Sequence, residues 1–305
     1  MAILSPVNAF RNIPQFIWTL ILFTYTDFKT IVATLTRRQT QPQLKRLQTI
    51  FASVAAPVHS ARRFLYGVVW TWLHLLQVDV SNQYQTAVED AINRPWRPLP
   101  GKRISQSSAA IFRWLLIPLC VLASFPFGSR VVLSSLGLTA LLVAHDELNW
   151  DKHWASKNII NTFGYMCFEL GATRIMNANL QLDGTAVQAL VFNALVVLTT
   201  IHSQDFSDME GDAALGRKTF PIYAPNISRI VTPVLLVAWS VLLGWAWSLG
   251  PTSQFLLYGL AGIVGCRFFW FRTRRYDANT YVVYNGWLLL THLLPAHGRW
   301  GVLSL

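Results

Sequence analysis

Charged residues are scarce in this sequence. Asp, Glu, Lys and Arg make up 13% of its 305 residues, whereas an average soluble domain carries about 25%. Hydrophobic residues make up 53%, and apolar stretches of about 18 residues or more recur along the chain. A soluble protein with so many of these stretches would expose surface that aggregates. The composition therefore excludes an ordinary soluble domain and predicts an all-α integral membrane protein.

Cysteine is rare as well. Cys120, Cys167 and Cys266 each lie alone in an apolar segment, and none belongs to a Cys-x-x-Cys pair. This pattern excludes a disulfide framework and a zinc site, and it predicts three small buried hydrophobic side chains.

Acidic residues number 14 against 25 Lys and Arg, which gives a formal net charge of +11. Most of the basic residues fall between apolar segments instead of forming one continuous soluble face. No nucleic-acid recognition module accompanies the charge, so we expect no nucleic-acid partner. The lipid bilayer is the expected partner, with anionic head groups binding part of the basic charge.

The apolar segments predict nine membrane helices. No connection between them is long enough to hold a separate soluble domain, so residues 1–305 are predicted to form a single membrane domain. The longest polar connections cover residues 37–62, 91–108 and 206–226. The helices are expected near residues 13–35, 63–88, 109–127, 130–149, 157–176, 186–205, 227–249, 254–272 and 281–300.

Alternating helix directions place the connections 91–108 and 206–226 on the same side of the membrane. Lys and Arg are more frequent on this side than on the opposite one, which favours a cytosolic location for it. We therefore expect a multi-pass protein of the endoplasmic reticulum membrane, with this face toward the cytosol.

The few acidic residues gather in two clusters, and the later one is the more regular. Asp205, Asp208 and Asp212 are spaced i, i+3, i+7, which places all three on one side of a helix. Like charges stacked in this way repel one another unless a cation lies between them. Mg²⁺ commonly binds one or two carboxylates together with substrate phosphates. The alternative interpretation is an ordinary solvated helix end.

The earlier cluster ends the second predicted helix. Asn82, Thr86 and Asp90 share a helix face, and Gln83 and Glu89 lie beside it. The best Mg²⁺ ligands among them are Asn82, Glu89 and Asp90. A polar helix end without a ligand explains this cluster equally well.

Carboxylates are costly near a bilayer core, and two such clusters with basic residues downstream indicate a site that holds divalent cations against a polyanion. A prenyl diphosphate is the polyanion best suited to a membrane. Anchoring to lipid head groups is the alternative role for each basic residue. The candidates for diphosphate binding are Arg97, Arg103, Lys157, Arg217 and Lys218.

A further acidic run, from His145 to Asp151, ends the fourth predicted helix. Three interpretations stay open for it. The run could cap the site, remove a proton from the reacting cation, or form an ordinary interfacial helix end.

The two clusters resemble a known family when they are taken together with the loop Asn-Arg-Pro-Trp-Arg-Pro-Leu-Pro-Gly-Lys-Arg at residues 93–103. This loop and the string Asp-Phe-Ser-Asp-Met-Glu-Gly-Asp at residues 205–212 are similar to motifs of the UbiA superfamily of intramembrane prenyltransferases. The resemblance implies a nine-helix bundle with a central cavity open to the membrane. It also implies that two aspartate-rich motifs bind Mg²⁺ and the diphosphate, whose departure leaves an allylic carbocation.

The sequence departs from the usual first motif of that family, Asn-Asp-x-x-Asp-x-x-x-Asp. Gln83 and Thr86 occupy two of the aspartate positions, while Asn82 and Asp90 match. This form is similar to a fungal branch that includes terpene cyclases. The resemblance therefore implies a Mg²⁺-dependent terpene cyclase that acts on farnesyl or geranylgeranyl diphosphate and uses Asn82, Asp90, Asp205, Asp208 and Asp212 in catalysis.

Two functions are alternatives to the cyclase. The first is a prenyltransferase that moves the same prenyl group to an aromatic or other small acceptor. The second is a transporter or structural membrane protein, which would carry charges deep in several helices and no acids clustered at two loops. The observed clustering disfavours this second alternative.

Overall fold

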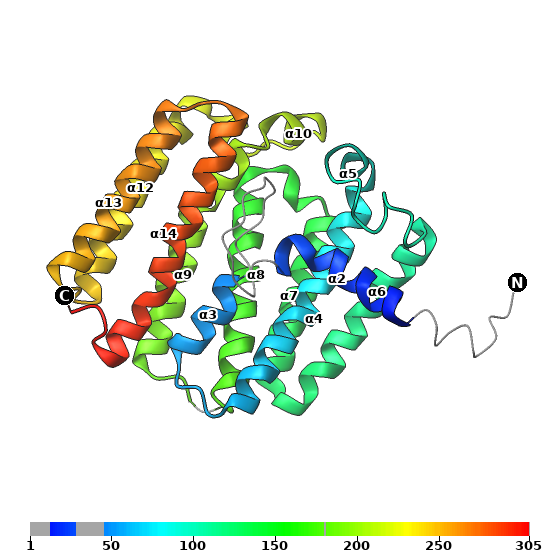
Figure 1. Cartoon of the computed structure of the whole chain (residues 1–305), viewed down its shortest axis with the longest axis horizontal. Coiled ribbons are helices and arrows are strands. Elements are labelled where there is room, and N and C mark those ends of the chain that lie inside the picture. Colours follow the sequence, from blue (N-terminus) through cyan, green and yellow to red (C-terminus); the bar gives the residue numbers. More distant parts are fainter. Residues whose placement is uncertain (1–12, 29–45, 180, 305) are drawn as a thin grey trace, which may run out of the picture.

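The computed structural model describes residues 13–28, 46–179 and 181–304. These residues are almost entirely helical, and the β-structure among them is a single isolated bridge between His153 and Lys218. The long helices run side by side as one bundle, and the short helices gather at its ends (Figure 1).

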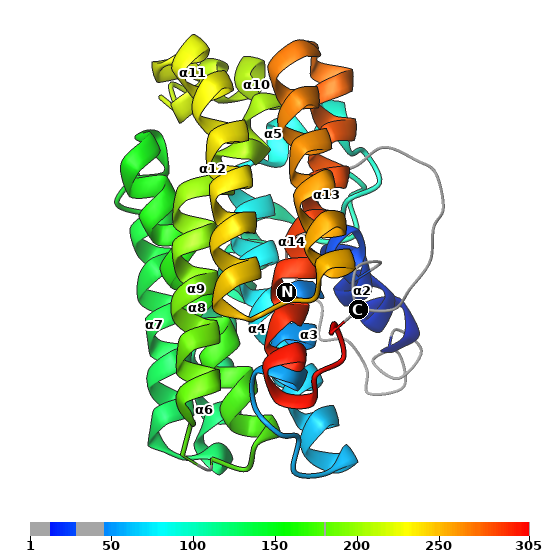
Figure 2. The same ribbon diagram turned by 90° about the vertical axis from the view of Figure 1, so that its left-hand side faces the viewer.

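Ten helices of the described residues form the body of this bundle. Their bounds are α2 (Ile13–Phe28), α3 (Arg46–Ala55), α4 (Ala61–Gln85), α6 (Gln106–Ser124), α7 (Ser129–Asp146), α8 (Trp154–Met176), α9 (Gly184–Thr200), α12 (Pro225–Ala246), α13 (Pro251–Trp270) and α14 (Arg274–Trp300). The connections contain the short helices α5 (Ala87–Asn93), α10 (Met209–Ala214) and α11 (Phe220–Tyr223), and the 3₁₀ segments η1 (Phe125–Phe127), η2 (Trp150–Lys152) and η3 (Ile201–Phe206). Figure 2 shows α5, α10 and α11 together at one end, at the top of the view.

Within the described part of the chain, three segments are long and apolar enough to cross a membrane: Gln106–Phe127, Gly184–Phe206 and Pro225–Ala246. Other long helices are more polar because they bury ionisable side chains inside the bundle. Glu169 in α8 and Asp277 in α14 are examples, with 0% and 2% of their surface exposed. The expected membrane bundle is therefore present as an all-helical fold whose interior is unusually polar.

The predicted helix positions agree with the structure to within a few residues for most of the chain. The helix expected at 281–300 is an exception, because α14 already begins at Arg274. Thr273 accepts a hydrogen bond from the backbone NH of Tyr276, which caps the helix at that earlier point. Of the helix expected at 13–35, the structure describes residues 13–28, and the remainder lies outside the described residues.

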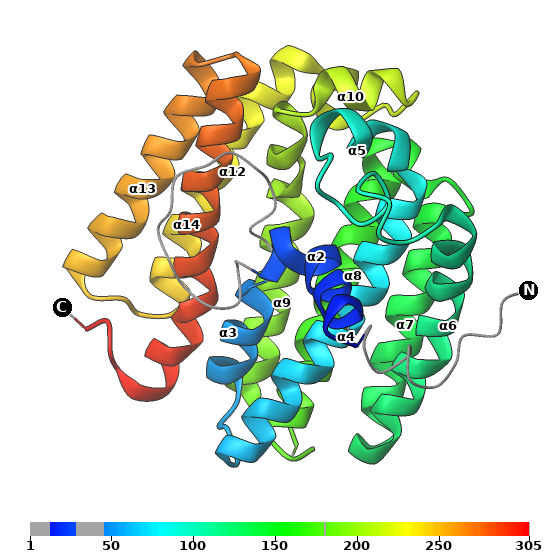
Figure 3. The same ribbon diagram turned by 45° about the vertical axis from the view of Figure 1, so that its right-hand side comes forward.

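The polar connection expected at 37–62 contains an additional helix, α3. It packs against α8 and α14 and lies beside the lower part of α14 in Figure 3. Phe51, Ala52 and Ala55 of α3 are all buried. With only ten residues, α3 is too short to be recognised as a membrane helix, and its stability depends on these tertiary contacts.

Close helix contacts depend on small residues at particular positions. Gly171 of α8 faces the ring of Trp70 in α4, and a side chain at this position would collide with the ring. The expectation of three buried cysteines is confirmed for one of them. All three thiols are free, but Cys120 is buried, Cys167 is half-buried and Cys266 is exposed on α13.

Candidate active site

The later acidic cluster does not lie on one continuous helix, so this part of the sequence prediction is wrong. Asp205 belongs to η3, Asp208 lies in the turn after it, and Asp212 belongs to α10. The α-helix ends at Thr200, whose hydroxyl bonds to the carbonyl of Val196 and to the hydroxyl of Tyr284 in α14, each within 2.8 Å. Such side-chain bonds compete with regular helix winding.

The same acids nevertheless converge on one lysine. Lys157 lies in the first turn of α8, and its Nζ is 2.7 Å from Oδ1 of Asp205 and 3.6 Å from Oδ2 of Asp212. Arg217 extends the chain of charges, because its Nη1 is 3.3 Å from Oδ1 of Asp212 and its Nε donates to Oδ2 of Asp151 at 2.7 Å. We call these five residues the Lys157 network.

Backbone hydrogen bonds hold the Lys157 network together. The NH of Trp154 donates to the carbonyl of Lys218 at 2.9 Å, and the NH of Lys218 donates to the carbonyl of Lys152 at 2.7 Å. These two bonds fix the loop after Asp212 against the start of α8. Arg217 and Lys157 are thereby brought to the same pair of carboxylates from different segments of the chain.

The carboxylates of the network suit a divalent cation. Oδ2 of Asp205 is buried and has no hydrogen-bond partner among the described residues, although this side chain is only 2% exposed. Asp208 is half-buried, and its burial, together with the charge of Asp212, raises the pKa of its carboxyl above the usual value. An added cation would relieve both the repulsion and the unsatisfied oxygen.

Protein ligands alone do not complete a metal site within the described part of the chain. No three His, Cys, Asp or Glu side chains come together there in a group that could hold a metal ion. Mg²⁺ often needs only one or two carboxylates, because substrate phosphates and water supply the other ligands. Asp205, Asp208 and Asp212 therefore fit a metal that binds together with a phosphate compound.

The earlier cluster is arranged differently. Asp90 is 1% exposed, and Nη1 of Arg97 lies 2.8 Å from its Oδ1 and 2.7 Å from its Oδ2. Gln83 turns into the bundle and donates to the carbonyl of Phe23 at 2.7 Å. Asn82 is exposed, and the side chain of Glu89 lies outside the described residues. In this arrangement Asp90 fixes the loop that carries Arg97.

The two clusters face each other across the end of the bundle. Arg94, whose Nη1 is 3.5 Å from Asp90, is near enough to Asp208 for its charge to act on that carboxyl. The hydroxyl of Tyr281 in α14 is likewise near enough to Asp205 and Asp208 to interact electrostatically with both carboxylates. Sequence patterns did not indicate Tyr281, because one tyrosine in an apolar helix carries no signal of its neighbours.

The remaining candidates are less closely involved. Arg103 and Lys218 are exposed at the same end of the molecule. Of the acidic run 145–151, only Asp151 joins the Lys157 network. Asp146 accepts a hydrogen bond from Ser81 and lies 2.7 Å from Nδ1 of His145, while Glu147 pairs with Arg113. Most of the run therefore forms a separate polar network around Arg113.

A bundle of membrane helices with a buried acid–base network at one end defines an integral membrane protein suited to holding a polyanion with cations and a divalent metal. The chain belongs to the UbiA prenyltransferase family, whose model matches residues 48–289.

Characterised relatives include both terpene synthases and a transferase. The fumagillin beta-trans-bergamotene synthase of Aspergillus fumigatus is 30% identical over 250 residues, which cover 81% of this chain and 84% of the relative. A diterpene cyclase of Hericium erinaceus is 27% identical over 234 residues, covering 75% and 74%. A polyprenyl transferase of the same fungus is 27% identical over 250 residues, covering 77% and 82%.

A solved structure supports the same fold. A UbiA homolog from Archaeoglobus fulgidus bound to GPP and Mg²⁺ matches with a TM-score of 0.60 at 11% identity, covering 91% of this chain and 99% of that chain. The expected family and its all-helical fold are thus confirmed, whereas the nine membrane spans and the central cavity stay predictions.

Proposed function

We propose that this protein is a Mg²⁺-dependent terpene cyclase of the membrane. It ionises farnesyl or geranylgeranyl diphosphate, cyclises the resulting carbocation and releases diphosphate. The observation that carries this proposal is the Lys157 network, which places two cations and three buried carboxylates at the end of the bundle, beside Asp208. A diphosphate ester and its metal need this mixture of charges.

The acidic and the basic residues of the site have different proposed roles. Asp205, Asp208 and Asp212 hold Mg²⁺, which neutralises the charge that develops on the departing diphosphate. Asn82, Glu89 and Asp90 of the earlier cluster are the further ligands that the family resemblance implies. The basic side chains bind the phosphate oxygens directly. These are Arg97, Arg103, Lys157, Arg217 and Lys218.

Cyclisation is favoured over transfer to an acceptor for two reasons. The bergamotene synthase matches this chain over more than four-fifths of both sequences. Gln83 and Thr86 also replace two acids of the usual transferase motif, as in the fungal cyclase branch that the sequence resembles. The alternative is a prenyltransferase acting on an aromatic or other small acceptor, and the similar polyprenyl transferase of Hericium erinaceus supports it.

We propose that the reaction takes place within the membrane. Residues 1–305 form one membrane domain of nine spans, with a dry central cavity that folds the prenyl chain and excludes water from the cation. The protein lies in the endoplasmic reticulum membrane, and the end that carries the Lys157 network faces the cytosol.

The test is an incubation of purified protein with Mg²⁺ and one prenyl diphosphate, without any acceptor. Ten-, fifteen- and twenty-carbon diphosphates are supplied separately, and organic products are identified by gas chromatography. We expect a cyclic hydrocarbon or alcohol from at least one of them, and no turnover once EDTA removes the metal. Product that forms only after an aromatic acceptor is added would instead establish the transferase.

A second prediction compares two residues of the earlier cluster. Asp90→Asn is expected to lower diphosphate release about 10–100-fold, because it weakens the charged contact that positions Arg97 near the phosphate seat. Gln83→Ala removes one neutral hydrogen bond and is expected to cost less than fivefold. Equal activity of the two variants would mean that this cluster is only a helix end.

A further inference from the structure

Three helices that contribute to the phosphate end also meet again deep in the bundle. In α8, Glu169 follows Lys157 by 12 residues, and in α14, His292 follows Tyr281 by 11 residues. Asn193 in α9 precedes Asp205 by 12 residues. At about 1.5–2.0 Å per residue, this second meeting point lies roughly 16–24 Å from the first, toward the opposite end of the bundle.

Glu169 contacts both Asn193 and His292 at this depth. Oε1 of Glu169 accepts a hydrogen bond from Nδ2 of Asn193 and lies 3.5 Å from Nε2 of His292. Neither the glutamate nor the imidazole side chain is exposed. We call these three residues the deep cluster.

The deep cluster keeps proton-accepting atoms available. Nδ1 of His292 lies 2.6 Å from the carbonyl of Leu288, which can only accept, so Nδ1 carries a proton and Nε2 is the basic nitrogen. Among the described residues, neither Nε2 of His292 nor Oε2 of Glu169 has a hydrogen-bond partner. A buried carboxylate with an unsatisfied oxygen is costly inside a membrane bundle, which points to a function beyond packing.

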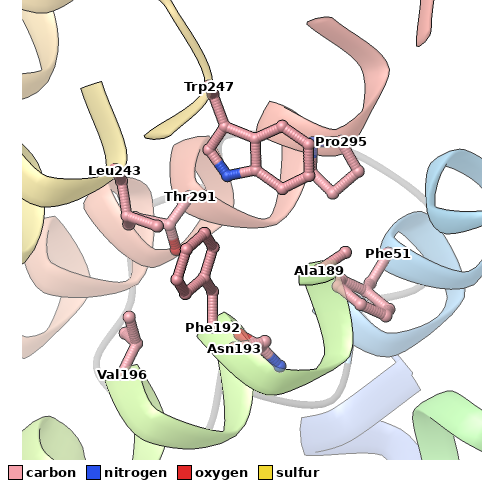
Figure 4. Close-up of a pocket in the computed structure, with 9 residues that line it drawn as sticks. All are labelled: Phe51, Ala189, Phe192, Asn193, Val196, Leu243, Trp247, Thr291 and Pro295. Carbon is pink, nitrogen blue, oxygen red and sulfur yellow. The ribbon is translucent and has the colours of Figure 1, made fainter. Parts of the chain in front are cut away.

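Aromatic side chains lie beside two members of this cluster. The ring of Phe51 in α3 is 5.6 Å from the imidazole of His292 at an angle of 78°. Asn193 also borders a cavity of about 10 Å³, room for roughly one water, whose walls include Phe51, Phe192 and Trp247 (Figure 4). Aromatic faces stabilise a nearby cation, and Asn193, which donates to Glu169, links this aromatic lining to the deep cluster.

We propose that Glu169 and His292 form the general base that ends the cyclisation, an inference that rests on the proposed function. The prenyl chain extends from the phosphate seat along the inner faces of α8, α9 and α14 toward the deep cluster. Oε2 of Glu169 takes a proton from a carbon next to the cationic carbon. The electrons of that C–H bond become the new C=C bond, the proton stays on Oε2 of Glu169, and Nε2 of His292 lies against the other carboxyl oxygen, Oε1.

Glu169→Gln tests this step, because the amide keeps the size of the side chain but cannot act as the base. Diphosphate release, which precedes deprotonation, is expected to stay within about threefold of the wild type. The share of the main hydrocarbon among the products is expected to fall at least tenfold. Other alkene isomers, or alcohols formed with water, should increase instead. Both are measured in one incubation, by phosphate assay and gas chromatography.

Ser135→Ala is the matched control. In this variant the buried His74 loses its 2.8 Å contact with Ser135, which joins a different pair of helices. Any change in products that comes from a general loosening of the bundle would therefore appear in this variant too. If Glu169→Gln does not fold in detergent, His292→Gln is the deciding variant, with the same expected change in products. An unchanged product pattern in the folded variant would overturn the inference, whereas wild-type protein without any diphosphate release would overturn the proposed function instead.

Discussion

Asp208→Ala is expected to lower the turnover number by about 10²–10³, which is the usual cost of losing one group that stabilises a departing anion. Asp208 lies between Asp205 and Asp212 in sequence and is the least buried of these three residues. Its removal should therefore disturb folding less than the removal of Asp205 would. Diphosphate release by purified protein measures the effect, and thermal unfolding in detergent shows whether the variant is folded.

Glu210→Ala is the matched control for this prediction. Glu210 is exposed in α10, two residues from Asp208, and carries the same charge. Its removal is expected to change turnover by less than twofold. Full activity of Asp208→Ala, or an equal loss in both variants, would contradict the assignment of Asp208 to the metal site.

Lys157→Met is expected to lower the free energy of unfolding by about 3–5 kcal/mol, because it leaves two buried carboxylates without the cation that bridges them. Mg²⁺ together with diphosphate should recover part of this loss, since both bind only to the folded protein. Denaturant unfolding with and without these ligands measures both effects.

The control for this variant is Lys152→Met, which removes an exposed lysine five residues earlier. It is expected to change the free energy of unfolding by less than 1 kcal/mol. A Lys157→Met protein as stable as the wild type would show that the Lys157 network does not hold the folded state together.

The sequence predicted the helices well because apolar length and charge depletion are local signals. It missed α3 because the ten residues from Arg46 to Ala55 lie in a polar connection and are buried through tertiary contacts, chiefly with α8 and α14. It also predicted that Asp205, Asp208 and Asp212 share one side of a helix. The change of winding depends on the contact between Thr200 and Tyr284, which are 84 residues apart.

Individual site residues were predictable, but their pairing was not. Lys157 was identified from its place at a helix start, whereas its bonds to Asp205 and Asp212 depend on how α8 meets the segment after α9. Asp90 and Arg97 were predicted as a metal ligand and a phosphate ligand, and the structure joins them to each other. Residue type predicts which side chains can bind a metal or a phosphate, but the geometry of the loops decides which charged side chains pair with each other.

The change of winding after Thr200 also sets how far along the bundle axis the acids of the candidate site lie. The six residues of η3 rise about 12 Å as a 3₁₀-helix, compared with about 9 Å as an α-helix. Asp205 is therefore carried about 3 Å further toward the end of the bundle, where it meets Lys157. In the reaction we propose, helix pitch as well as residue identity would thus fix the level at which the water-soluble anion separates from the hydrocarbon.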